Sequence, residues 1–230
     1  MEFKFKIQPY QTAAADAVCD AFEGQPSQAP LAYLRDLGRV GSAGSGERAL
    51  FPFSDEGEGY ANAPVALTPS ELLRNVNRVQ RANQIAESRE LFDGMGACQL
   101  DVEMETGTGK TYVYTKTMFE LNRRYGWTKF IVVVPSVAIR EGVCQSLRST
   151  EQHFFEQYGK AIRFFMYGSD RLSELDAYAQ STDINCMVIN MQAFNTSMKE
   201  GGGNKAARII FDERDEFGSR RPIDVIAANR

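Results

Sequence analysis

The sequence predicts an α/β fold with a mainly parallel β-sheet and helices on both faces of the sheet. Between residues 98 and 191, short apolar segments that suit strands alternate with longer amphipathic segments that suit helices. Residues 129–135 are almost continuously apolar, as expected for a strand that is covered on both faces. Strands separated by helices favour parallel pairing through right-handed crossovers. A chain of 230 residues, 43% of them hydrophobic, is long enough to bury one large core.

Two helices are expected before this alternating region, with a glycine-rich segment between them. Residues 9–24 place apolar side chains at helical spacing and end at a glycine. The second helix begins at Thr68, because Thr68 and Glu71 match a capping box. Residues 24–63 contain seven Gly and three Pro, well above the usual share, so we expect an insertion or a mobile loop there. Within it, residues 31–37 would supply one or two helical turns.

The alternating region is expected to contain four strands and three helices. The strands are residues 98–104, 129–135, 162–167 and 185–191. The helices are a segment that ends at Gly126, a segment of about 137–149 and a segment of about 170–180. Arginines at 123 and 124, followed by Gly126, are typical of a helix C-terminus.

The composition argues against several classes of protein. A net charge of −4 gives no basic footprint over the whole chain, so any contact with nucleic acid must be local. Four separated cysteines and a single histidine do not have the spacing of a zinc site or of a disulfide framework. The sequence has neither a secretion signal nor an apolar run of about 18 residues, so we expect a cytoplasmic protein without membrane segments.

The segment after residue 104 has the composition of a phosphate-binding loop. It consists of Glu105, Thr106, Gly107, Thr108, Gly109, Lys110 and Thr111. Its second half fits G-x-x-x-x-G-K-[ST], with Met104 where the first glycine belongs. The glycines let backbone N–H groups turn towards phosphate oxygens at the positive end of the next helix. Lys110 would neutralise the β- and γ-phosphates and Thr111 would bind Mg²⁺, so both are candidate catalytic residues. The alternative is a tight turn with a solvated lysine.

A second candidate site lies near the N-terminus. The stretch FKIQPYQTAA resembles the Q motif, in which Gln11 would bond the adenine edge through one donor and one acceptor. Tyr10 or Phe5 would pack against the base. A glutamine on a short helix is otherwise an ordinary surface residue, so its meaning depends on the motifs that accompany it.

A third candidate site follows the strand at 129–135. Pro135 and Ser136, with Arg140 on the next helix, resemble motif Ia of superfamily 2 helicases and translocases, which faces the nucleic-acid backbone. A serine, a helix N-terminus and an arginine suit phosphate contacts that position DNA without reading its sequence. The alternative is an ordinary strand-to-helix turn with a surface arginine.

Together these motifs resemble the N-terminal part of the Res subunit of type III restriction–modification enzymes. The resemblance is carried by IQPYQ, LTPSELLRNVNRVQRAN, DVEMETGTGKTYVY, FIVVVPSVAIREGV, VINMQAFN and RIIFDERDEFGSRRPIDVIAANR. These segments span nearly the whole chain except the glycine-rich segment. The long spacer also fits, since Gln11 and Lys110 lie 110 − 11 = 99 positions apart, and Met104 is usual in that family.

The resemblance implies a three-layer, RecA-like P-loop domain over residues 1–230, the first motor lobe of an ATP-dependent DNA translocase and site-specific endonuclease. It implies ATP and Mg²⁺ as cofactors, and double-stranded DNA and a methyltransferase (Mod) subunit as partners. The second motor lobe, the nuclease domain and the strand with the D-E-x-x box are absent from the sequence. We therefore expect this fragment to bind nucleotide but to hydrolyse it poorly.

Three alternatives stay open at this point. Asp212 and Glu213 follow an apolar run and imitate the acidic strand, although the charged residues around them favour a solvated turn. A small-molecule kinase would use the same phosphate loop, with Arg220 and Arg221 as lid arginines. An ATP-binding interaction module without turnover would use it as well.

Overall fold

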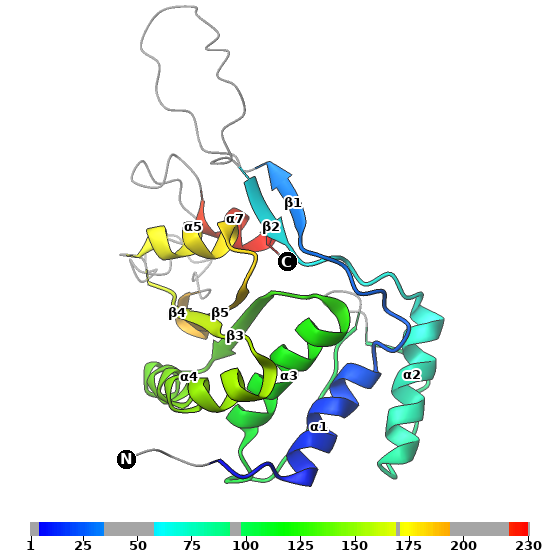
Figure 1. Cartoon of the computed structure of the whole chain (residues 1–230). Helices are drawn as coiled ribbons and strands as arrows, with labels where there is room; N and C mark the ends of the chain where they lie inside the picture. Colours follow the sequence, from blue (N-terminus) through cyan, green and yellow to red (C-terminus); the bar gives the residue numbers. More distant parts are fainter. Residues whose placement is uncertain (1–4, 35–57, 93–97, 169–170, 194–220, 230) are drawn as a thin grey trace, which may run out of the picture. The chain divides into compact units, whose positions relative to one another are not determined.

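The protein is described by a computed structural model that covers residues 5–34, 58–92, 98–168, 171–193 and 221–229 (Figure 1). Within these ranges, no helix is both long and apolar enough to cross a membrane. The chain divides into two compact units. The first unit is made of Met1–Ala29, Ala63–Trp127 and Ser146–Ala161, and the second of Pro30–Asn62, Thr128–Gln145 and Ile162–Arg230.

The first unit is helical. Its elements are α1 (Pro9–Asp20), α2 (Pro69–Ala82), α3 (Lys110–Tyr125) and the C-terminal part of α4 (Val137–Tyr158). Aromatic rings join α3 to α4, because Phe119 stacks on Phe154 and on Tyr158 with ring centroids 5.1 and 5.0 Å apart. Burying such large rings stabilises the contact between the two helices, and their stacked geometry adds to the area term.

The expected capping box of α2 is confirmed. The Thr68 hydroxyl accepts the Glu71 N–H at 3.3 Å, and the Glu71 carboxylate accepts the Thr68 N–H at 2.8 Å. Leu72 is buried on the inner face of the helix, while the Asn75 amide donates to the carbonyl of Glu23 at 2.8 Å. The buried apolar side chains of Leu72 and Val76, together with the buried Asn75 amide, fix α2 in this unit.

The end of α3 is also confirmed. Gly126 has φ of 79°, and its N–H donates to Asn122 at 2.9 Å. A Cβ at this position would collide with the backbone carbonyl of Gln28, so both the left-handed backbone and the close approach require glycine.

The second unit contains a parallel sheet in the order β3-β5-β4. Its strands are β3 (Lys129–Val134), β4 (Ile162–Met166) and β5 (Ile184–Asn190). Around them are α5 (Leu172–Gln180), the 3₁₀ turn η2 (Met191–Ala193) and α7 (Pro222–Ala228). The central strand β5 is buried from Ile184 to Ile189, and its side chains form a core with Leu175, Tyr178 and Val225. A mixed helix and strand fold with a parallel sheet therefore agrees with the sequence.

The glycine-rich segment, residues 24–63, contains two short strands in place of the expected helical turns. Strand β1 (Leu31–Leu34) pairs antiparallel with β2 (Glu58–Ala61), with Leu31 opposite Ala61. The prediction of helical turns is therefore wrong for residues 31–34, because pairing with β2 satisfies the backbone groups of these residues instead. Residues 35–57, the middle of the predicted insertion, lie outside the described residues.

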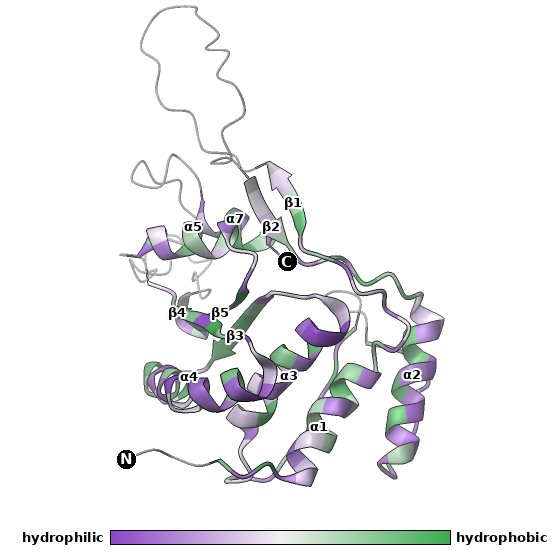
Figure 2. Cartoon of the chain, viewed as in Figure 1, coloured by the Kyte–Doolittle hydropathy of each residue, from purple (hydrophilic) through white to green (hydrophobic). Residues whose placement is uncertain are grey.

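Three further expectations differ from the structure. Residues 98–104 form no strand, since no described strand supplies a hydrogen-bonded partner for them. After Lys129, strand β3 is hydrophobic (Figure 2), yet Ile131 and Val133 are 38% and 52% exposed, so only one of its faces is covered within the described chain. Helix α4 continues beyond residue 149 to Tyr158, because Phe154 and Tyr158 pack on α3 and extend its buried face.

Candidate functional site

The phosphate-type loop lies in the first unit, directly before α3. Gly107 and Gly109 have φ of 85° and 87°, in the left-handed region that side chains with a Cβ rarely adopt. Gly109 precedes the first residue of α3, Lys110. The two glycines thus allow a tight turn directly before α3. The first backbone N–H groups of the helix lie next to this turn.

The backbone donors of this turn are largely unused. Thr108 closes the loop on itself, since its hydroxyl donates to the Glu105 carbonyl at 2.7 Å. Among the described residues, no acceptor receives the N–H groups of Gly107, Gly109, Lys110, Thr111 or Tyr112. Unsatisfied N–H groups at the positive end of a helix form a binding site for an anion.

The side chains of Lys110 and Thr111 stand at the first turn of α3. Lys110 is exposed, and its ammonium group has no hydrogen bond or ion pair within the described parts of the chain. Thr111 is half-buried. Glu105 and Thr106 are exposed on the approach to the turn. A single free cation beside unused backbone donors suits a polyphosphate chain, and a threonine hydroxyl next to it suits a magnesium ligand.

Two residues of the predicted adenine site reach this loop. The Gln11 amide donates to the Thr108 carbonyl at 2.9 Å, and the Tyr10 hydroxyl donates to the same oxygen at 3.2 Å. Gln11 is 8% exposed, whereas Tyr10 is 50% exposed. In a regular α-helix, the Tyr112 N–H would donate to the carbonyl of Thr108, four positions earlier. Here the side chains of Tyr10 and Gln11 donate to that carbonyl instead.

Phe5 lies in a different contact. Its ring centroid is 5.4 Å from the ring of His153 and the residue is 36% exposed. His153 in turn shares a hydrogen bond of 2.8 Å with the hydroxyl of Tyr112, the residue that follows the loop. Burial lowers the pKa of His153, so the ring favours its neutral form.

Sequence analysis did not find the partners that hold α1 against α3. Lys116, only 3% exposed, donates to the Thr12 hydroxyl at 2.8 Å. His153 and Tyr112 were missed as well. The contact between them joins residues 41 positions apart, so no local pattern predicts it. The sequence signals are only that His153 is the single histidine and that Tyr112 adjoins the loop.

The predicted DNA-contact residues lie in the second unit, at the start of α4. The Ser136 hydroxyl accepts the Ile139 N–H at 3.3 Å, so this serine caps the helix, and Pro135 before it is exposed. The Arg140 side chain is 20% exposed, with a long 3.5 Å hydrogen bond to the Tyr167 carbonyl. Its buried Nε atom has no partner within the described residues. Its NH2 atom lies 3.6 Å from the Glu141 carboxylate, so the arginine is held by two long polar contacts.

The remaining candidates either lie outside the described residues or make a local contact within the second unit. Asp212, Glu213 and Arg220 lie outside the described residues. Arg221 forms an ion pair of 2.7 Å with Asp224 in the first turn of α7. That pair gives the guanidinium a local structural role, so it lends the lid-arginine interpretation no support. The described residues also contain no group of three His, Cys, Asp or Glu that would hold a metal.

Comparison with known proteins gives one consistent family. The family profile described as "Type III restriction enzyme, res subunit" matches residues 4–220. The EcoPI Res subunit of Escherichia phage P1 is 32% identical over 149 residues, and the EcoP15I Res subunit of Escherichia coli is 37% identical over 150 residues. Each of these alignments covers 60% of this chain and 15% of the relative. The StyLTI Res subunit of Salmonella typhimurium is 54% identical over 61 residues, which is 26% of this chain and 6% of that relative.

Proposed function

Because the chain belongs to the family of type III restriction enzyme Res subunits, we propose that it forms the ATP-binding first lobe of a DNA translocase motor. The observation that carries this proposal is the turn that leads into α3. Beside two left-handed glycines, several backbone N–H groups have no acceptor among the described residues, and the Lys110 ammonium group has no partner among them either. The chain aligns with only 15% of EcoPI and EcoP15I Res, so the activity of the whole enzyme is part of the proposal.

The loop would hold the phosphates of ATP. The backbone N–H groups of Gly107 and of residues 109–112 would donate to the phosphate oxygens, and the α3 dipole would add a favourable field. Lys110 would neutralise charge on the β- and γ-phosphates, while the Thr111 hydroxyl would be a ligand of Mg²⁺. A bound Mg²⁺ would neutralise the charge that develops on the phosphates during transfer.

Gln11 would select the base. One of its amide hydrogens is used by Thr108 at 2.9 Å, which leaves the second hydrogen and the amide oxygen for a ligand. These are one donor and one acceptor, the complement of adenine N7 and N6. Tyr10, half-exposed beside Gln11, and Phe5 are the aromatic candidates for packing against the base.

The remaining parts of the proposal concern the intact enzyme. Pro135, Ser136 and Arg140 would contact the backbone of double-stranded DNA, for which Arg140 would have to leave the Tyr167 carbonyl. The full fold would be a three-layer, RecA-like domain with helices on both faces of the sheet. A second motor lobe, a nuclease domain and a methyltransferase (Mod) subunit would complete a cytoplasmic enzyme that cleaves DNA site-specifically.

The proposal is tested by measuring the binding of MgATP and of magnesium tripolyphosphate by calorimetry, with Lys110→Ala beside the wild type. Lys110→Ala removes the one free cation of the loop, so the affinity for both ligands should fall by about tenfold to a hundredfold, the effect of losing charge-assisted hydrogen bonds. Lys160→Ala is the matched control, because Lys160 lies in the same unit but donates to Asn122 at 2.9 Å. Equal affinities in Lys110→Ala and the wild type would contradict the proposal.

A further inference from the structure

Helices α1 and α3 lie side by side and run in the same direction. Near their N-termini, Gln11 of α1 reaches the Thr108 carbonyl just before α3. Near their C-termini, Asp20 of α1 reaches Arg124 of α3 at 2.6 Å. The two N-termini therefore meet at the phosphate-type loop, and the two C-termini meet at a separate charged contact.

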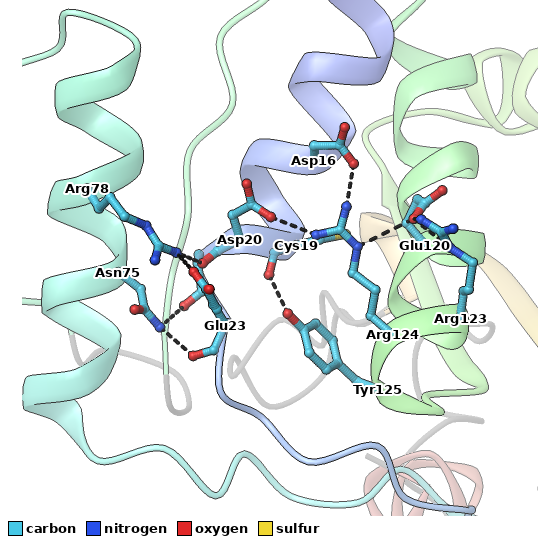
Figure 3. Close-up of polar contacts among 11 residues, drawn as sticks. Asp16, Cys19, Asp20, Glu23, Asn75, Arg78, Glu120, Arg123, Arg124 and Tyr125 are labelled. Carbon is cyan, nitrogen blue, oxygen red and sulfur yellow. Dashed lines mark hydrogen bonds and ion pairs between the residues drawn. The ribbon is translucent and has the colours of Figure 1, made fainter.

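This charged contact, which we name the α1–α3 clasp, consists of Asp16, Asp20, Glu120 and Arg124 (Figure 3). One guanidinium group bridges all three carboxylates. Its NH2 atom is 2.5 Å from Asp16, its NH1 atom 2.6 Å from Asp20 and its Nε atom 3.4 Å from Glu120. Asp16 and Asp20 are four positions apart, on one face of α1, so a planar fork of donors can reach both. The cation also faces the negative ends of both helices.

The surroundings fix the orientation of the clasp. Glu120 has a side chain only 7% exposed, and its second oxygen accepts the Tyr158 hydroxyl at 2.7 Å. The Tyr125 hydroxyl donates to the Cys19 carbonyl at 2.8 Å, beside the clasp (Figure 3). Arg124 is therefore held on an oriented carboxylate of its own helix and presents its remaining N–H groups to α1. The Asp16 and Asp20 side chains are 38% and 47% exposed, so the fixed direction of the guanidinium comes from the buried Glu120 carboxylate.

We propose that Arg124 is a positioning residue for base selection, an inference that rests on the proposed ATP-binding function. Near the loop, Tyr10 and Gln11 share the single Thr108 oxygen, and the Thr12 hydroxyl beside them accepts a hydrogen bond from Lys116 at 2.8 Å. The clasp at the other end of α1 sets the position of the helix and so the direction of the Gln11 amide. The phosphates are held by the backbone of the loop itself. Loss of the clasp should therefore weaken the choice of base and leave the grip on phosphate intact.

The test uses the whole chain and compares Arg124→Met with Arg123→Met. Arg123 is the matched control, because it bonds Glu120 at 2.5 Å within α3 and is 63% exposed. Dissociation constants are measured for MgATP, MgGTP and magnesium tripolyphosphate. For Arg124→Met we expect the preference for ATP over GTP to fall about tenfold, the effect of about one hydrogen bond, with tripolyphosphate affinity changed less than about twofold. Arg123→Met should keep the wild-type preference.

A second variant keeps the test decisive if Arg124→Met folds poorly. Asp16→Asn with Asp20→Asn removes the charges on α1 but keeps the side-chain shapes, and it should reduce the preference for ATP to the same extent. An unchanged preference in either folded variant overturns the inference, and so does an equal loss of affinity for all three ligands. If the wild type binds tripolyphosphate but does not prefer ATP over GTP, the inference about Arg124 is overturned and the proposed function is not. A wild type that binds none of the three ligands overturns the proposed function as well.

Discussion

Gly107 and Gly109 have nearly the same backbone conformation but different neighbours. Both have φ close to 86°, at 85° and 87° respectively. A Cβ added at Gly107 would have no atom within 4 Å, whereas a Cβ at Gly109 would lie 2.5 Å from the Gln11 amide nitrogen. The first glycine is therefore needed for its backbone conformation, and the second also for the close approach of Gln11.

This difference predicts unequal effects of the same substitution. Gly107→Ala should cost about 1–2 kcal/mol in free energy of unfolding, the strain of a left-handed alanine. Gly109→Ala should cost more, because Gln11 must also move away from the Thr108 carbonyl and lose its hydrogen bond. Urea unfolding of the two variants measures both values. Equal losses would show that Gln11 does not pack on the loop as described.

At the loop, the local pattern predicted a glycine turn and a helix that begins near Lys110, both of which the structure has, but it did not predict the neighbours of these residues. The spacing of two glycines, a lysine and a threonine requires only a short stretch of chain. The shared use of the Thr108 carbonyl by Tyr10 and Gln11 joins residues 97 and 98 positions apart. The contact of Phe5 with His153 joins residues 153 − 5 = 148 positions apart. Such contacts depend on tertiary packing, which the sequence around each residue does not encode.

At the scale of an element, α3 contains a buried carboxylate that should make stability depend on pH. Burial alone would raise the pKa of Glu120, but hydrogen bonds from Tyr158 and Arg123, with the charges of Arg123 and Arg124, lower it below its ordinary value of 4.5. A carboxyl group whose folded pKa is lowered stabilises the fold above its unfolded pKa. That stability is lost as the pH falls from about 4.5 through the folded pKa.

We therefore expect the wild type to lose more stability on acidification than Glu120→Gln, whose neutral side chain does not titrate. The midpoint of urea unfolding, measured at about pH 6 and again below about pH 4, gives the difference. Glu151→Gln is the control, since this residue is exposed on α4 and should follow the wild type. An equal decrease of the urea midpoint on acidification in the wild type and in Glu120→Gln would contradict the ionic role of Glu120.

Element boundaries were predictable where local chemistry determines them. The Thr68 capping box and the left-handed Gly126 mark the ends of α2 and α3 in sequence and in structure alike. The expected strand at residues 98–104 depends instead on a neighbouring strand, and no described strand pairs with it. The extra length of α4 likewise depends on aromatic packing of Phe154 against α3.

At the scale of the whole molecule, the chain is organised as two compact units, and the two predicted sites belong to different units. The phosphate-type loop and α1 belong to one unit, and Ser136 and Arg140 belong to the other. The start of β3 is fixed within its own unit, because the Asn62 side chain accepts the N–H groups of Thr128 and Lys129 at 2.8 and 2.9 Å. The proposed motor function thus assigns nucleotide binding to the first unit and DNA contact to the second.

Amide chemical shifts of the isotope-labelled chain during titration with MgATP test the central claim most directly. If the unused N–H groups of the loop and of the first turn of α3 bind the phosphates, the amide chemical shifts of residues 107–112 should change together and saturate with MgATP concentration. Lys110→Ala should strongly weaken this response. Saturating shifts elsewhere in the chain, with the amides of residues 107–112 unchanged, would contradict the claim.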